Sequence, residues 1–236
     1  EGAEYELRTE LATLVTKSIL HIHPNSTWLT TEEDFELGTK NKRPWRMDYF
    51  YQYLRRKTGI LMDNGKPVGG RYSLDGENRK PWKGTPSAPV PPMFKADKIS
   101  LEVKALIEKV FHHHIGQVNL QTLPRTEAHA ERLWTWVQNN CLIHFGPYED
   151  AMSTQSKTLF HSCLSPLINI SRLLPQRIID DVLSLELPLS SKEGFIRQIL
   201  GWREFMRHVH RRTQGFRKLD TQQWSVEASP CSRWKH

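Results

Sequence analysis

Apolar residues recur at steps of three and four along much of this chain, a spacing that places them on one face of a helix. Near the start, leucine, valine and isoleucine follow this spacing over residues 5–21. The same spacing predicts helices over 45–61 and near 98–112, 126–143, 166–174, 176–186 and 191–211. Residues 19–24, "ILHIHP", end at a proline and predict a short strand. The pattern therefore predicts a mainly α chain that begins with the tail of an α/β unit.

Between residues 62 and 94 the helical spacing disappears, and glycine and proline are frequent. Such a stretch indicates a long irregular connector, which is where a domain boundary is expected. The last residues have no sustained period and predict a disordered tail. We therefore expect four parts: an α/β remnant at 1–40, a helix with a long linker at 41–125, a helical part at 126–216 and a tail at 217–236.

Positive charge exceeds negative charge, with 33 Lys and Arg against 26 Asp and Glu among 236 residues. The cations gather in residues 40–57 and 201–218, each of which contains one acidic residue. Clustering of this kind is typical of proteins with a polyanionic partner, and it predicts nucleic acid. A solvated basic face with no partner is the alternative.

No apolar stretch approaches the roughly 20 residues that a membrane span needs, so we expect no contact with a membrane. The acidic start, "EGAEYELRTE", lacks an initiator methionine and a signal peptide, and it is typical of a chain that begins within a domain. Cys141, Cys163 and Cys231 are widely separated, which argues against a disulfide scaffold or a self-contained zinc or iron–sulfur site. We expect a cytoplasmic protein, and a monomer.

Motifs for metal binding and nucleophilic catalysis are weak in this sequence. Residues 111–116, "FHHHIG", hold three histidines, but consecutive histidines rarely present two imidazoles to one metal, so we predict no metal site. Ser162 lies beside His161 without a third partner, and the nucleophile motif GxSxG is absent. Neither a GxGxxG nor a GxxxxGK[ST] loop is present.

The segment 159–175, "LFHSCLSPLINISRLLP", contains the start of a predicted helix. Ser165 is a suitable N-cap, and Pro166 suits the first helical position. Free backbone N–H groups and nearby hydroxyls at such a start predict an anion site. A buried structural turn is the alternative, because the surrounding residues are apolar.

Residues 193–210, "EGFIRQILGWREFMRHVH", combine an apolar stripe with a basic one. Trp202 lies on the apolar stripe, while Arg203, Arg207 and His210 form the basic stripe beside it. An aromatic edge next to a basic edge suits nucleic acid, since cations hold phosphates and aromatic surfaces meet bases. The alternative is that Trp202 belongs to the core and the arginines are solvated.

Four stretches of the chain, in this order, resemble the cryptochrome/photolyase superfamily. They are similar to its photolyase-related branch, the prokaryotic (6-4) photolyases that carry an iron–sulfur cluster. The stretches are 50–82 "FYQYLRRKTGILMDNGKPVGGRYSLDGENRKPW", 144–152 "HFGPYEDAM", 159–170 "LFHSCLSPLINI" and 194–207 "GFIRQILGWREFMR". The resemblance implies an N-terminal α/β antenna domain, a long linker and an all-helical FAD-binding domain, of which this chain holds the first part.

The resemblance also implies the residues of the site. The turn "HSCLS" at 161–165 corresponds to the one that holds the FAD pyrophosphate, and "QILGWREF" at 198–205 to a wall of the flavin cavity and lesion surface. The implied cofactor-binding residues are Tyr148, His161, Ser162, Cys163, Leu164, Ser165, Asn169 and Gln198. The expected DNA-binding residues are Trp202 and Arg203, to which the basic stripe adds Arg207. No catalytic residue is assigned.

The function implied is light-driven repair of damaged DNA, in which FAD donates an electron to a flipped-out pyrimidine lesion of the (6-4) type. A cryptochrome-like blue-light sensor and a non-catalytic basic DNA-binding fragment are the alternatives. Cys163 stands where many members have arginine. We expect a fragment in which the sites of the antenna chromophore and the 4Fe-4S cluster are incomplete. This fragment alone is expected to be inactive and to hold FAD weakly, because a flavin buried between two half-sites needs both.

Overall fold

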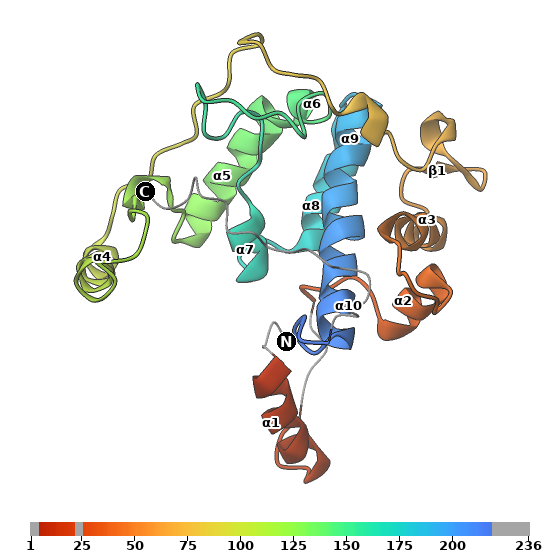
Figure 1. The fold of residues 1–236 in the computed structure, drawn as a ribbon. Helices are drawn as coiled ribbons and strands as arrows, with labels where there is room; N and C mark the ends of the chain where they lie inside the picture. The colour runs from red at the N-terminus through yellow and green to blue at the C-terminus, as the bar shows by residue number, and fades with distance from the viewer. Residues whose placement is uncertain (1–4, 22–25, 219–236) are drawn as a thin grey trace, which may run out of the picture. The chain divides into compact units, whose positions relative to one another are not determined.

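The computed structural model describes residues 5–21 and 26–218 of the chain (Figure 1). The chain divides into two units, one made of Glu1–His23 with Met206–His236 and the other of Pro24–Phe205. The tail predicted at 217–236 falls almost entirely outside the described residues, as does Cys231. Residues 22–24 of the strand predicted at 19–24 also lie outside the described residues, and residues 19–21 are not in a strand.

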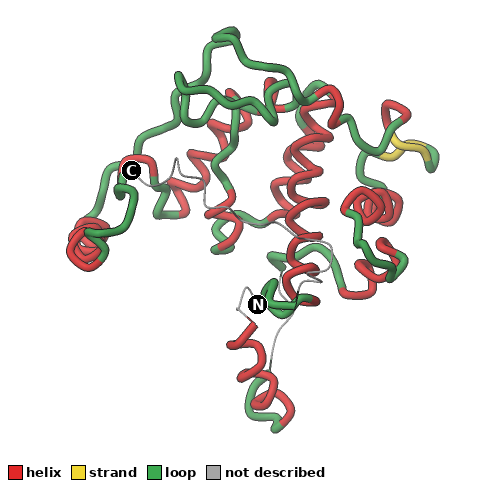
Figure 2. Tube along the Cα trace, in the orientation of Figure 1, coloured by secondary structure: helices red, strands yellow, loops and turns green. Residues whose placement is uncertain are grey.

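Helices and loops make up nearly all of the described chain (Figure 2). The first unit contains α1 (Tyr5–Thr16). The α-helices of the second unit are α2 (Glu32–Thr39), α3 (Met47–Thr58), α4 (Lys98–Val110), α5 (Glu127–Asn140), α6 (Leu142–Phe145), α7 (Ser165–Asn169), α8 (Pro175–Ser184) and α9 (Leu189–Ile196). Short 3-10 turns are η1 (Val68–Gly70), η2 (Asp75–Glu77) and η3 (Leu120–Thr122). The prediction of a mainly α chain is confirmed. None of the helices among the described residues is long and apolar enough to span a membrane.

One helical run continues from α9 through η4 (Arg197–Arg203), a π-helix, into α10 (Glu204–Arg212). Within the second unit, α9 and η4 lie between α3 and the pair α6 and α8 (Figure 1). Gly201 permits the close approach of α3, because a Cβ at this position would lie 3.2 Å from the sulfur of Met47 and 3.3 Å from the ring of Tyr51.

Aromatic rings form the core between α2, α3 and the start of α10. The ring of Phe35 lies 5.6 Å from that of Phe50 and 5.7 Å from that of Phe205. A second buried cluster joins α5, α6, α8 and α9, and it includes Leu133, Trp134, Val137, Leu142, Ile178, Ile179, Val182 and Ile196. The indole of Trp134 also donates a hydrogen bond of 2.7 Å to Asp181, which ties α5 to α8.

Residues 62–94 contain little regular structure, as the sequence predicts. They begin with the hairpin of β1 (Met62–Asp63) and β2 (Lys66–Pro67), whose Asn-Gly turn adopts positive φ at both positions. The fully buried guanidinium of Arg55 holds the hairpin by donating to the carbonyls of Ile60, Leu61 and Tyr72. The role of this stretch as an interdomain linker remains a prediction.

Helix α2 is the element that hydrophobic spacing does not predict. It depends on a capping box, in which Thr31 caps the backbone N–H of Asp34 and Asp34 accepts from the backbone N–H of Thr31 at 2.9 Å. The buried Asp34 carboxylate also accepts from Tyr53 at 3.1 Å and from Lys57 at 2.5 Å. Burial alone would raise the pKa of Asp34, but the hydrogen bonds from Lys57 and Thr31 outweigh it and hold that pKa below its ordinary value.

Replacing Asp34 should therefore destabilise the fold in a pH-dependent way. We expect Asp34→Asn to lower the free energy of unfolding by about 1–2 kcal/mol at pH 7, measured by urea denaturation. Because the native pKa of Asp34 is lowered, this stability is present above the unfolded-state pKa of 3.8 and is lost as the pH falls through the native value. Glu33→Gln removes a carboxylate from the same helical turn and is the control. An equal loss in both variants would contradict the role of Asp34.

Candidate functional site

A cavity of about 580 Å³ opens between the turn before α7 and the side of α9 and η4. Its lining residues are Phe145, Glu149, Asp150, His161, Ser162, Cys163, Leu164, Ser165, Ile168, Asn169, Phe195, Gln198, Ile199 and Arg203. Seven of the eight residues predicted to bind a cofactor are therefore on one cavity wall or the other, and Tyr148 is not. This volume lies within the range of small-molecule sites, which is about 300–1,000 Å³.

Backbone geometry shapes the turn at residues 161–165. Cys163 adopts a left-handed conformation with φ of 55°, and the buried side chain of Leu164 anchors the turn in the core. The N–H of His161 donates to the carbonyl of Thr158 at 2.8 Å. The turn thus places Ser162 and Ser165 in the cavity wall on a fixed backbone.

The prediction of an N-cap at Ser165 is wrong. Leu164 is the N-cap of α7 and makes no side-chain capping bond, whereas Ser165 is the first helical residue and Pro166 lies in the first turn. Because α7 has only five residues, its few aligned peptide dipoles create little positive potential at its N-terminus. Anion binding here would have to depend on the side chains and amides of the turn, since the helix itself contributes little.

Tyr148 lies next to the turn and outside the cavity lining. Its ring is stacked on Phe160 with the ring centroids 5.2 Å apart, and its hydroxyl donates to the carbonyl of Thr85 at 3.2 Å. Phe160 belongs to a small buried cluster with Ala151 and Leu159, against which Tyr148 packs. Tyr148 therefore supports the segment that leads into the turn.

The opposite wall depends on the π-helical geometry of η4. Hydrogen bonds in a π-helix join residues five apart, so residues i and i+5 lie one turn apart. This brings Gln198 and Arg203 to the same cavity, with Ile199 beside them. Such π-helical turns are frequent at functional sites.

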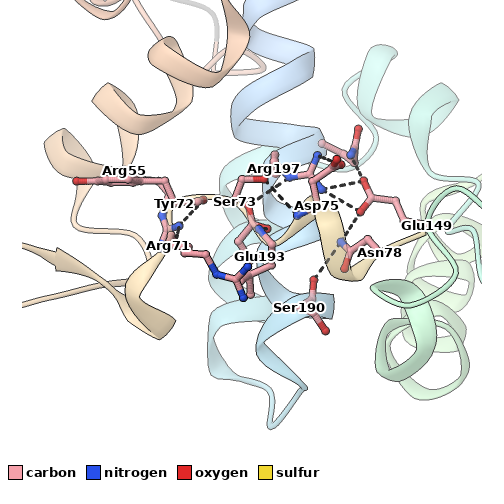
Figure 3. A network of polar contacts seen from close by, with 12 residues as sticks. Arg55, Arg71, Tyr72, Ser73, Asp75, Asn78, Glu149, Ser190, Glu193 and Arg197 are labelled. Atoms are coloured by element: carbon pink, nitrogen blue, oxygen red, sulfur yellow. Dashed lines mark hydrogen bonds and ion pairs between the residues drawn. The ribbon is translucent and has the colours of Figure 1, made fainter. Parts of the chain in front are cut away.

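A buried polar network lies next to this wall, centred on Arg197 (Figure 3). The side chain of Arg197 is 4% exposed and forms ion pairs with Glu149 at 3.1 Å, Glu193 at 3.3 Å and Asp75 at 3.3 Å. Asn78, which is fully buried, donates to Glu149 at 2.7 Å. The network thus joins α9 and η4 to η2 and to the loop after α6.

Helix α9 leaves room for this network by having a glycine. A Cβ on Gly194 would lie 2.5 Å from the amide nitrogen of Asn78 and 2.8 Å from a carboxylate oxygen of Glu149. The hydrophobic spacing of the sequence does not reveal Arg197, Glu149 or Asn78. A usable signal was present, since Glu193 and Arg197 are oppositely charged residues four positions apart on one helical run.

Glu149 is both a member of the network and a lining residue of the cavity. Its burial raises the pKa of its carboxyl, and the charge of Arg197 with the hydrogen bonds from Asn78 and Gln198 opposes this without reversing it. The amide of Gln198 donates to the other carboxylate oxygen of Glu149.

Arg203, which the sequence predicts to bind DNA, is largely enclosed in this structure. Its guanidinium lies 3.8 Å from the centroid of the Trp28 ring and donates to the carbonyl of Thr27 at 2.7 Å. The neighbouring Glu204 accepts from the hydroxyl of Thr30 at 2.7 Å. Arg203 and Glu204 thus fasten residues 27–30 to this helical run, and Arg203 also lines the cavity. A contact with DNA remains a prediction for it.

Trp202 and Arg207 lie elsewhere. The indole of Trp202 is 41% exposed, packs edge-on against Phe205 and does not line the cavity. Arg207 is on α10, in the part of the chain that belongs to the first unit. Their DNA roles also remain predictions.

Among the described residues, the cysteines and histidines form no metal centre. Within residues 5–21 and 26–218, no three His, Cys, Asp or Glu side chains are grouped so that they could hold a metal ion. Cys141 is buried, and its burial, with a smaller contribution from Cys163, raises the pKa of its thiol to about 12. Cys163 is exposed at the cavity wall.

Comparison with known proteins gives a consistent result. The model of the deoxyribodipyrimidine photo-lyase-related protein family matches residues 1–123. A (6-4) photolyase from Agrobacterium fabrum is 34% identical over 219 residues, which are 89% of this chain and 43% of that protein. The uncharacterized protein R853 of Acanthamoeba polyphaga mimivirus is 37% identical over 70 residues, 27% of this chain and 53% of that protein. The chain thus spans about half the length of these two relatives or less.

The Arg197 network makes a strong prediction for stability. Arg197→Met should lower the free energy of unfolding by about 3–5 kcal/mol at pH 7, because it leaves buried carboxylates without their cation. The loss should shrink as the pH is lowered, since the uncompensated carboxylates then take up protons. Arg79→Met, which removes an exposed arginine that pairs with Asp75 and Asp150, is the control and should cost below about 1 kcal/mol in the same urea titrations. Similar losses in both variants would show that the network does not hold the fold.

Proposed function

Because this chain belongs to the family of deoxyribodipyrimidine photo-lyase-related proteins, we propose that it is part of a light-driven DNA-repair photolyase of the (6-4) type, and that its cavity holds part of an FAD molecule. The observation that carries the proposal is the convergence of the "HSCLS" turn and of Gln198 on one cavity. These two segments resemble the flavin-binding segments of the superfamily, and they are far apart in the sequence.

The chemistry of the lining suits a flavin nucleotide. The hydroxyls of Ser162 and Ser165 can donate hydrogen bonds, and phosphate oxygens accept such bonds. Phe145, Ile168 and Phe195 supply an apolar surface of the kind that a flat ring system covers. A bound reduced flavin would supply the light-excited electron for splitting a pyrimidine lesion. The residues of this chain bind and orient the flavin. Tyr148 does not line the cavity, and it supports the "HSCLS" turn at 161–165, called the serine turn below.

We include damaged DNA as the partner. The support is a group of exposed cations around the start of α3, in the basic stretch 40–57. The guanidinium of Arg43 lies 4.5 Å from the centroid of the Trp45 ring, and that of Arg46 lies 4.5 Å from the centroid of the Tyr49 ring. Cations beside aromatic rings suit a nucleic-acid backbone. Arg55 is not part of this surface, because it is fully buried.

The serine turn gives a direct test of the flavin site. We expect free FAD to bind the full chain in a fluorescence titration, and the double variant Ser162→Ala/Ser165→Ala to weaken binding at least about ten-fold by removing two phosphate donors. Ser87→Ala/Ser184→Ala removes two exposed hydroxyls away from the cavity and is the control. FAD should also slow alkylation of Cys163 at pH 8.5. A wild-type chain that binds no FAD, or a serine variant that binds it as well as the wild type, would refute the assignment.

The basic surface at α3 predicts a salt-dependent contact with DNA. Lys42→Ala/Arg43→Ala should weaken binding to lesion-bearing and undamaged duplexes alike. If both cations contact phosphates, the slope of log K against log salt should become shallower by about 2, because each contact contributes about 0.9. Lys98→Ala/Lys109→Ala removes the same charge from α4 and is the matched control. The same slope for both double variants would show that α3 carries no specific part of the DNA surface.

A further inference from the structure

The amide of Gln198 faces the carboxylate of Glu149 at the cavity wall. The two ends of a glutamine amide have similar size but opposite hydrogen-bonding character, since the NH₂ donates and the carbonyl oxygen accepts. An ionised carboxylate has no hydrogen to donate. Glu149 can therefore hold only the NH₂ end of Gln198, and this choice leaves the carbonyl oxygen, Oε1, as the end available to a ligand.

Glu149 is itself held from its other side. Its Oε2 accepts from the amide of Asn78 at 2.7 Å and pairs with the guanidinium of Arg197 at 3.1 Å. Its side chain is only 8% exposed. All three neighbours, Asn78, Arg197 and Gln198, are donors, and three donors are satisfied together by a carboxylate that only accepts. The carboxylate is thus fixed in position and in hydrogen-bonding character before any ligand arrives.

We infer that Glu149 is a positioning residue, which turns Gln198 so that the cavity offers an acceptor at this point and selects the N–H or O–H groups of a ligand. The inference rests on the proposed function, because it concerns the same flavin site. A phosphate at neutral pH has acceptors almost exclusively, so neither Gln198 Oε1 nor the Glu149 carboxylate would hold one. The hydroxyl- or N–H-bearing part of the flavin therefore lies at Gln198, and the pyrophosphate lies at the serine turn.

A double-mutant cycle separates this role from a merely structural one. Gln198→Met removes the acceptor and keeps the length of the side chain. Glu149→Gln keeps the shape of the carboxyl group, but its own amide can donate or accept, so the orientation of Gln198 is no longer fixed. A residue that acts through Gln198 loses its effect on binding once Gln198 is gone, whereas a structural residue adds its own effect.

The measurement is the affinity of the full chain for FAD in wild type, the two single variants and the double variant, with thermal unfolding of each recorded alongside. We expect each single variant to bind about ten-fold more weakly and the double variant to bind no more weakly than Gln198→Met. Effects that multiply in the double variant would overturn the inference while leaving the flavin site in place. A wild type that binds no FAD would overturn the proposed function as well, so the two failures are distinguishable.

Because Glu149→Gln also removes a partner of the buried Arg197, it can prevent folding. The second measurement therefore needs only the wild type and Gln198→Met. In an amide NMR spectrum of nitrogen-labelled protein without ligand, the side-chain NH₂ signals of Gln198 are those missing from the variant. We expect one of these protons to be shifted downfield and to move as the pH is lowered and Glu149 takes up a proton. Signals at the ordinary position of a solvated glutamine, unchanged by pH, would overturn the inference.

Discussion

The guanidinium of Arg197 is the point on which the second unit depends. It lies in the helical run between α9 and η4, and its carboxylate partners come from η2, from α9 itself and from the loop after α6 (Figure 3). Replacing such a buried ion network by apolar residues is often neutral for stability, but removing one member is costly because the others remain charged and buried. The network therefore joins three segments through one buried cation.

The cavity inherits its geometry from this arrangement. Glu149 belongs to the network on one side and to the cavity wall on the other, so a shift of the 74–78 segment would move a lining residue. The serine turn is held by Leu164 in the core and by the Tyr148–Phe160 stack. Because Tyr148 directly precedes Glu149, the loop after α6 supports both walls of the cavity, which is how a rigid scaffold positions groups around a site.

Much of the helical framework could be predicted from the sequence, because helices such as α3, α5 and α8 bury one face and hydrophobic spacing reports that face. Helix α2 was not predicted, because a capping box at Thr31 and Asp34 specifies it more than an apolar stripe does. The residues around Ser165 predicted an anion site at a helix start, but the assignment of 161–165 to a flavin site came from resemblance, since a turn has no periodicity. Apart from the Glu193–Arg197 pair, the network could not be predicted, because Glu149 and Asp75 come from segments about 50 and 120 residues away from Arg197, and spacing along one helix contains no such information. Ser165 was misassigned since the first turn of α7 begins one residue earlier than its proline suggested.

The π-helical turn η4 has a consequence for which side chain the cavity receives. In an α-helix, each residue advances by about 100°, so the residue one turn after Gln198 would be Trp202. The wider turn of η4 delays the repeat by one position and gives that place to Arg203. A shift of one residue in helical register thus places the cation of Arg203 at the cavity, where an α-helix would place the indole of Trp202. The same shift leaves Trp202 exposed.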